Sequence, residues 1–195
     1  MVNKLSAEHE CPIDNYIIQF INKHLHIYRK LGFTPNMVTT LSIIFGLLSA
    51  NQILQGNYLV SSLLMLVAYY FDCVDGKLAR KYNMITPFGD YYDHFGDLFK
   101  IAAIIYALIK TSRAKLTGRQ KMFICIVIIL TLLQILHFGY QERIYDRGHE
   151  SPFLSIFKKL THYDSFPEDT IKYTRHFGCG TWMVCFALII YFWNK

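Results

Sequence analysis

Charged residues are scarce in this chain. Of its 195 residues, 17% are Asp, Glu, Lys or Arg, and 53% are hydrophobic. A soluble globular domain carries about 25% charged residues. The shortage argues against a soluble fold and indicates that lipid surrounds much of the chain. This length suits one domain, so residues 1–195 are interpreted as a single membrane-embedded domain.

Paired cysteines are also lacking. The five cysteines are widely spaced and form no CxxC motif, so neither a disulfide framework nor a structural zinc site is predicted. The formal net charge is +6, but the Lys and Arg residues lie between apolar runs. They suit an anionic membrane surface or a phosphate-bearing substrate, and no nucleic-acid partner is expected.

The apolar residues that are present follow helical periods. Over residues 13–31 they recur at three- and four-residue spacing, which predicts an amphipathic helix lying along the membrane interface. A spanning helix needs roughly 20 mainly apolar residues. The predicted spans are 36–55, 58–79, 88–111, 120–140 and 178–194, with a polar connection at 141–177. The expected fold is therefore an all-α polytopic membrane helix bundle.

The distribution of positive charge predicts an orientation. Lys and Arg are more numerous in the segments on the side of the N-terminus than on the opposite side. This bias predicts a cytoplasmic N-terminus, although the basic segment 110–121 argues against it locally. In this orientation, the connection between the second and third spans is cytoplasmic.

Four carboxylates lie where the second span ends and the third begins. Asp72 and Asp75 are three residues apart, so on a helix they point from one face. Asp93 and Asp97, four residues apart, do the same on the next helix. If the two helices pack as an antiparallel hairpin, all four carboxylates converge. Such a cluster needs counter-charge, and hard divalent cations such as Mg²⁺, two of them clamping a phosphoryl group, would supply it.

Small residues and one arginine accompany the carboxylates. Small side chains let membrane helices approach closely, and an arginine can bind phosphate oxygens with two hydrogen bonds. These residues are Gly76, Ala79, Gly89, Gly96 and Arg80. Each feature alone has an ordinary explanation as a solvated helix end, a common membrane glycine or an interface anchor. Their joint spacing favours a phosphate-handling site.

Together these residues resemble a known signature. The pattern Asp72-x2-Asp75-Gly76-x2-Ala79-Arg80-x8-Gly89-x3-Asp93-x3-Asp97 is similar to that of the CDP-alcohol phosphotransferase (phosphatidyltransferase) family, with every position present. Pro35-Asn36-x2-Thr39 is a shorter match to a stretch that the family carries near its nucleotide site. Family members commonly have six membrane helices, so the resemblance implies five to six spans. The catalytic helices would lie within 36–140, and the polar segment 141–177 departs from the family pattern.

The resemblance implies roles for individual residues. Asp72, Asp75, Asp93 and Asp97 would hold two Mg²⁺ or Mn²⁺ ions. A second set would bind the CDP moiety of the donor: Gly76, Ala79, Arg80, Gly89, Asn36 and Thr39. Attack by an acceptor hydroxyl on the distal phosphorus would release CMP. Either Asp97 or His94 would be the base that takes the hydroxyl proton.

Donor and acceptor are open at this point. The short single-domain chain resembles enzymes that transfer a phosphatidyl group from CDP-diacylglycerol to inositol, glycerol phosphate or serine. The sequence Asp93-His94-x2-Asp97 instead resembles the choline and ethanolamine phosphotransferases, which act on diacylglycerol and are much longer. The resemblance also implies a homodimer.

Two other classes of function compete with an enzyme. Intramembrane acids also mark ion pathways in transporters, but there they are spread over several broken helices. Here they are bunched at one level of the chain's predicted bundle. An inactive scaffold would be expected to have lost a signature residue, and all are present.

Overall fold

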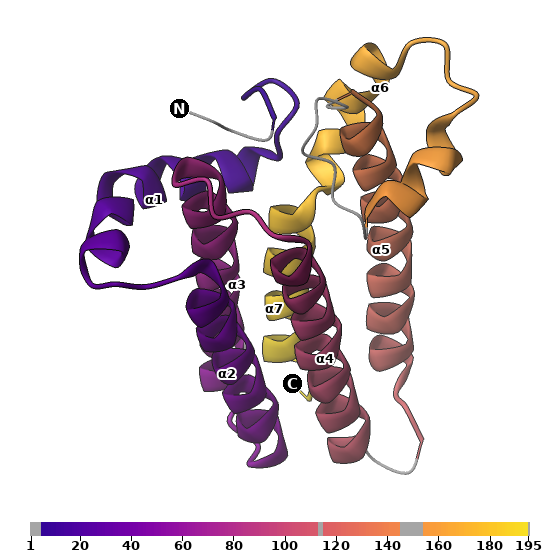
Figure 1. Ribbon diagram of the computed structural model, residues 1–195. Helices are drawn as coiled ribbons and strands as arrows, with labels where there is room; N and C mark the ends of the chain where they lie inside the picture. Colours follow the sequence, from indigo (N-terminus) through magenta and orange to yellow (C-terminus); the bar gives the residue numbers. More distant parts are fainter. Residues whose placement is uncertain (1–4, 113–114, 145–153, 195) are drawn as a thin grey trace.

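The computed structural model describes residues 5–112, 115–144 and 154–194, which fold as helices without any strand (Figure 1). The long helices are α1 (Pro12–Lys30), α2 (Pro35–Leu54), α3 (Tyr58–Lys81), α4 (Pro87–Thr111), α5 (Gly118–Ile144) and α7 (Cys179–Phe192). Shorter elements precede α7: η1 (Leu154–Thr161), α6 (Pro167–Thr174) and η2 (Arg175–Phe177). The prediction of an all-α polytopic bundle is confirmed.

Local sequence signals set the ends of the helices near the carboxylates. The hydroxyl of Thr34 accepts a hydrogen bond from the backbone N–H of Met37 and caps α2. Thr86 caps α4 in the same way, with its Oγ1 3.0 Å from the backbone nitrogen of Gly89. Gly32, with a φ of 79°, turns the chain between α1 and α2, because a left-handed backbone there favours glycine.

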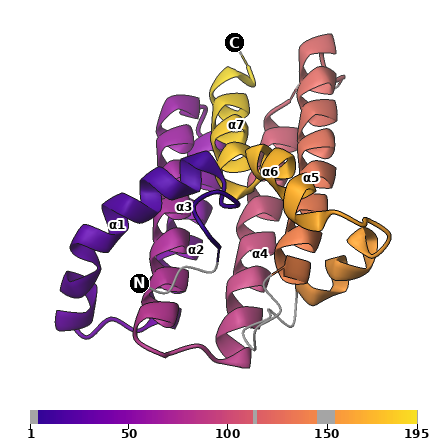
Figure 2. The same cartoon turned by 90° about the horizontal axis from the view of Figure 1, so that it is seen from above.

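The long helices other than α1 run side by side, and α1 lies across one end of the bundle (Figures 1 and 2). Helix α2 packs along both α3 and α4, whereas α3 and α4 share few direct contacts. The two helices are antiparallel, as the hairpin considered from the sequence requires, but their closest backbone packing is with α2. The side chains of α3 and α4 meet beside α2.

Helix α1 is held to the bundle by its apolar face. Ile21 and Leu25 are fully buried against Val38 of α2 and Val74 and Leu78 of α3. Burying a side chain of this size contributes about 1.5–3 kcal/mol. The opposite side of α1 carries exposed polar residues, as the amphipathic pattern of 13–31 predicts for an interfacial helix.

Among the described residues, four segments are long and apolar enough to cross a membrane: α2, α3, α5 and the run Pro167–Phe192. Helix α4 falls outside this group because Asp97, Lys100 and Lys110 interrupt its apolar stretch. It nevertheless lies within the bundle beside α2 (Figure 1). Helix α7 begins at Cys179, in agreement with the predicted last span of 178–194, and the segment Pro167–Phe192 also includes the polar α6 and η2.

The polar connection predicted at 141–177 is partly visible. Residues 145–153 lie outside the described residues, and the rest extends α5 and forms η1, α6 and η2. Gly139 of α5 permits close packing, since a Cβ there would lie 2.6 Å from the carbonyl oxygen of Phe157. The Arg143 guanidinium donates a hydrogen bond to the carbonyl of Thr161. These contacts fix the connection against the end of α5.

Candidate metal and phosphate site

Three of the four predicted carboxylates converge. One oxygen each of Asp72, Asp93 and Asp97 lies within 4.8 Å of the others. Asp72 is presented by α3, and Asp93 and Asp97 are presented by successive turns of α4. The spacing argument for the α4 pair is thus confirmed in the geometry. The cluster lies in the half of the bundle nearest α1, because α3 ends and α4 begins there (Figure 1).

Asp75 lies at the edge of this cluster. Its Oδ2 accepts a hydrogen bond of 2.7 Å from the Thr39 hydroxyl of α2, and both side chains are buried. Asp75 is still close enough to interact electrostatically with Asp72 and Asp93. Thr39, expected to bind the nucleotide, instead contacts a candidate metal ligand in this structure.

A buried lysine lies inside the cluster. The Lys100 ammonium is 2.9 Å from Asp72 Oδ1 and 2.6 Å from Asp97 Oδ1, and it donates a 2.6 Å hydrogen bond to the Ser42 hydroxyl. Its exposed fraction is 0%. The sequence interpretation missed Lys100, although one signal was available. A lysine three residues after Asp97, at the start of an apolar run, has a carboxylate as its natural helical neighbour.

Helix α2 makes room for this lysine. Gly46 faces the Lys100 stem so closely that a Cβ on Gly46 would lie 2.7 Å from Lys100 Cβ. Gly96 of α4 meets the same helix, since a Cβ there would lie 2.6 Å from Ile43 Cδ1. The predicted close approach at Gly96 therefore exists, but its partner is α2. The two glycines keep α4 close enough for its side chains to reach α3.

The donor set fits a hard divalent cation. Asp93 Oδ1 is buried and has no hydrogen-bond partner among the described residues. An unpaired buried carboxylate oxygen is costly unless it binds a cation. Oxygen-only ligands from carboxylates are those that Mg²⁺ and Mn²⁺ prefer. The arrangement can therefore hold a divalent ion through Asp72, Asp93 and Asp97.

Arg80 lies beside the carboxylates on α3. Its guanidinium folds back over Gly76, where a Cβ would lie 3.1 Å from one of its terminal nitrogens. Its Nε is buried without a hydrogen-bond partner in the described part of the chain. Gly76 thus gives Arg80 the space for this conformation, and an anionic ligand could accept the unused N–H. Ala79 lies next to Arg80, and its carbonyl accepts a hydrogen bond from the backbone of Met84.

Asn36 and Gly89 meet at the start of α2 and α4. A Cβ on Gly89 would lie 3.2 Å from the Asn36 side-chain oxygen. These two residues, expected from separate parts of the sequence, therefore come together at the same end of the bundle as the carboxylates. Both are partly exposed, so a ligand can reach them.

His94 projects from α4 next to Asp93. Its Nδ1 is 2.7 Å from the backbone carbonyl of Asp90 and 3.8 Å from Asp90 Oδ1. It also lies within electrostatic range of Asp72. A histidine whose Nδ1 is held by a carbonyl can present the other ring nitrogen to a ligand. Both Asp97 and His94 are near the cluster, so the geometry leaves both as candidate bases.

A buried carboxylate connects α1 with the helices behind the site. Asp14 accepts hydrogen bonds from the Tyr69 hydroxyl and, at 3.2 Å, from the backbone nitrogen of Gly180 at the start of α7. Burial raises the pKa of Asp14, and the hydrogen bond from Tyr69 acts in the opposite direction. Tyr69 lies one turn before Asp72 on α3, so this contact supports the helix that carries the cluster.

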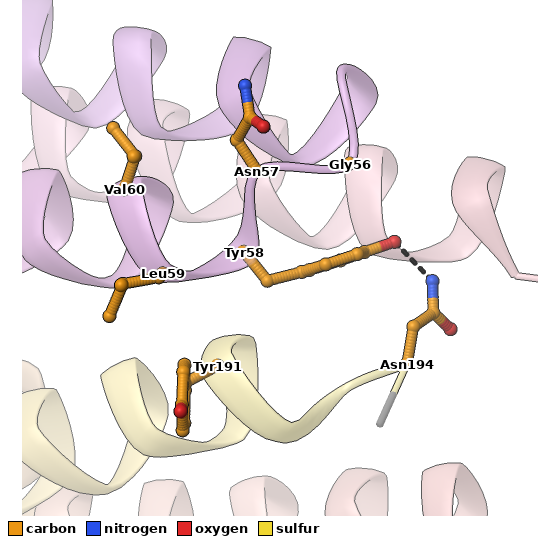
Figure 3. A pocket seen from close by; sticks show the side chains of 7 residues that line it. All are labelled: Gly56, Asn57, Tyr58, Leu59, Val60, Tyr191 and Asn194. Carbon is orange, nitrogen blue, oxygen red and sulfur yellow. Dashed lines mark hydrogen bonds between the residues drawn. The ribbon is translucent and has the colours of Figure 1, made fainter.

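A surface pocket lies elsewhere, near the other end of the bundle (Figure 3). It has a volume of about 350 Å³ and is lined by Gly56, Asn57, Tyr58, Leu59, Val60, Tyr191 and Asn194. The Asn194 side chain donates a hydrogen bond to the Tyr58 hydroxyl across it. Tyr58 is about 21 Å from Asp72 along α3 at the helical rise of 1.5 Å per residue. The pocket is thus separate from the carboxylates.

A sequence model of the family described as CDP-alcohol phosphatidyltransferase matches residues 33–162. The chain is 28% identical to the archaetidylinositol phosphate synthase of Pyrococcus horikoshii over 79 residues, 40% of this chain and 42% of that protein. It is 30% identical to choline/ethanolaminephosphotransferase 2 of Arabidopsis thaliana over 104 residues, 47% of this chain and 26% of that protein. It is 39% identical to the CDP-diacylglycerol--glycerol-3-phosphate 3-phosphatidyltransferase of Rickettsia felis over 51 residues, 26% of this chain and 28% of that protein. The matches span less than half the length of these relatives, and no solved structure matches.

Proposed function

This chain belongs to the CDP-alcohol phosphatidyltransferase family and is a membrane phosphotransferase, and we propose that it transfers a phosphatidyl group from CDP-diacylglycerol to an alcohol hydroxyl with release of CMP. The observation that carries the proposal is the convergence of Asp72, Asp93 and Asp97 within 4.8 Å around an unpaired carboxylate oxygen. This arrangement suits a reaction at a phosphate group that needs concentrated positive charge.

The carboxylates would hold Mg²⁺ or Mn²⁺. Asp72, Asp93 and Asp97 are the principal ligands in this proposal, and Asp75, oriented by Thr39, completes the set for two ions. When bound, the ions would neutralise charge on the phosphate oxygens of the donor and on the departing CMP. This chain's part is to hold the ligand oxygens in place, which α3 and α4 do while both pack along α2.

The nucleotide end of the donor would bind beside the carboxylates. In this proposal, Arg80 donates hydrogen bonds to the diphosphate, and Gly76 leaves its guanidinium the necessary space. Ala79, Gly89 and Asn36 line the rest of the CDP site, at the ends of α3, α4 and α2. Thr39 contributes indirectly, through its hydrogen bond to Asp75.

In the reaction, the acceptor oxygen forms a bond to the distal phosphorus while the bond from that phosphorus to the CMP oxygen breaks. The acceptor proton passes to Asp97 or His94. Asp97 already accepts a hydrogen bond from Lys100, whereas His94 directly follows Asp93 on the same helix.

A second candidate function shares the same site. His94 directly follows Asp93, as in the choline and ethanolamine phosphotransferases, and one of the relatives above carries that name. In that case the donor would be CDP-choline or CDP-ethanolamine and the acceptor diacylglycerol. The CDP-diacylglycerol reaction is preferred because the Rickettsia felis relative, 39% identical over its matched residues, is named for that donor.

The remaining partners follow from the membrane setting. We propose that the cluster opens to the cytoplasmic side, because the positively charged N-terminal segments lie at that end of the bundle. Donor and acceptor lipids would then enter from the bilayer, and the nucleotide from water. The family resemblance also favours a homodimer, which remains a prediction.

An assay of CMP release by the purified protein in lipid–detergent micelles with Mg²⁺ tests the proposal. CDP-diacylglycerol is paired with inositol, inositol phosphate, glycerol phosphate or serine, and CDP-choline or CDP-ethanolamine is paired with diacylglycerol. We expect release with one CDP-diacylglycerol pair. Release only with an amino-alcohol donor would establish the second candidate. A folded protein that releases no CMP with any pair would contradict both and favour an inactive scaffold.

A further inference from the structure

Lys100 is a buried cation in the middle of the candidate metal site. Its ammonium contacts Asp72 Oδ1, Asp97 Oδ1 and the Ser42 hydroxyl, all within 2.9 Å, so three donors meet three acceptors. A buried ammonium is stable only when it is paired in this way. These contacts satisfy all three N–H donors of Lys100, but they do not satisfy every carboxylate of the cluster. Asp93 Oδ1 has no hydrogen-bond partner in the described part of the chain.

The lysine and a metal ion need the same atoms. The three oxygens that come within 4.8 Å of one another belong to Asp72, Asp93 and Asp97, and Lys100 is hydrogen-bonded to two of these residues. An ion bridging the cluster would have to share or replace the lysine contacts, since an ammonium and a divalent cation at the same oxygens repel each other.

We propose that Lys100 is an internal cation that occupies part of the acidic cluster in the ligand-free protein and competes with a divalent metal ion for Asp72 and Asp97. The inference rests on the proposed function, because it takes the cluster to be a metal site. Lys100 keeps the carboxylates close together before metal binds, and its charge weakens the binding of metal.

The surroundings of Lys100 fit a group that can move. A lysine side chain is a flexible stem with a compact charge, unlike the rigid planar fork of arginine. Gly46 leaves the stem in contact with the α2 backbone, and the Ser42 hydroxyl belongs to α2 and stands outside the carboxylate set. The ammonium can therefore give up one carboxylate and keep Ser42 as an acceptor.

The competition predicts an unusual effect of removing the lysine. Lys100→Met keeps the length and apolar stem but removes the charge that opposes the metal ion. We expect the variant to bind Mn²⁺ roughly ten- to a hundredfold more tightly than the wild type, on the scale of one charge interaction at an effective dielectric of about 20. A residue that merely positions the carboxylates would give the opposite result, weaker binding after its loss.

The test is Mn²⁺ binding to the substrate-free protein in detergent, followed by the electron paramagnetic resonance signal of free Mn²⁺. Lys110→Met is the matched control, because Lys110 is an exposed lysine at the far end of the same helix. Tighter binding by Lys100→Met alone supports the proposal. Unchanged or weaker binding by Lys100→Met overturns it.

A second variant tests the proposal if Lys100→Met does not fold. Lys100→Gln removes the positive charge but keeps an N–H donor for Ser42 and the carboxylates, so we expect Mn²⁺ to bind roughly tenfold more tightly than to the wild type. Equal or weaker binding by a folded Lys100→Gln protein would then overturn the competition. If no variant and no wild-type protein binds Mn²⁺, the proposed metal site itself fails, which is a separate outcome.

Discussion

Thr39 offers a direct test of how the site is built. Its hydroxyl donates a 2.7 Å hydrogen bond to Asp75, and the two side chains have exposed fractions of 4% each. Thr39→Val replaces the hydroxyl by a methyl group of nearly the same size. The helix and its packing are retained, but one oxygen of a buried carboxylate loses its donor.

The magnitude follows from the charge and burial of this contact. A hydrogen bond to a charged group contributes about 1.5–3 kcal/mol, and about 1.4 kcal/mol corresponds to a factor of ten. If this energy orients Asp75 as a metal ligand, Thr39→Val should lower kcat/KM roughly 10- to 150-fold at limiting metal. Added Mg²⁺ should recover part of the loss, because the defect lies in metal binding.

The assay is CMP release with Mg²⁺ and the CDP donor varied independently. We expect the Mg²⁺ concentration for half-maximal activity to rise in Thr39→Val, with the KM for the donor changed little. Thr39→Ser is the control, because it keeps the hydroxyl and should retain most activity. A raised donor KM with normal Mg²⁺ dependence would refute this reasoning and return Thr39 to the nucleotide site that the sequence suggests.

Further outcomes can be checked on the same preparation. Asp93→Asn should lower CMP release at least about a hundredfold while the protein elutes as a folded particle in detergent, because the change removes a charged ligand; an active variant would contradict the metal assignment. Removal of divalent ions with EDTA should stop the reaction, and added Mg²⁺ or Mn²⁺ should restore it; full activity without metal would refute the need for an ion. Asp14→Ala should lower the thermal unfolding temperature in detergent, because Tyr69 and Gly180 lose a buried acceptor worth about 2–4 kcal/mol in total. Asp169→Ala, which removes only a surface ion pair, should change that temperature little.

Much of the fold follows from the sequence because apolar length and helical period are local properties. The predicted segments match α1 to α5 closely, and Pro35 and Pro87 mark the starts of two helices. The predicted last span, 178–194, agrees with α7 at Cys179–Phe192. The short helices α6 and η2 before it were predicted only as part of a polar connection, because they are too short and too polar to show an apolar period.

The carboxylates of the site could be predicted from the sequence, whereas the helix and side chains that surround them could not. Spacing places Asp93 and Asp97 on one face of α4, and the structure confirms their approach to Asp72. The helical periodicity of the sequence shows which face of a helix carries a residue, but it does not show against which other helix that face packs. For this reason the sequence interpretation paired α3 with α4 and missed that both pack along α2, along with the contact of Lys100 with Ser42.

Helix α2 packs along both helices that carry the carboxylates, which has a consequence for how such a protein can diversify. Where α2 and α4 are in close contact, at Gly46 against Lys100 and at Ile43 against Gly96, added atoms would have to push α4 away from α2. Such a shift would also move Asp93 and Asp97 relative to Asp72. Substitutions on α2 can therefore tune the spacing between the two sets of ligands while every reacting group keeps its identity.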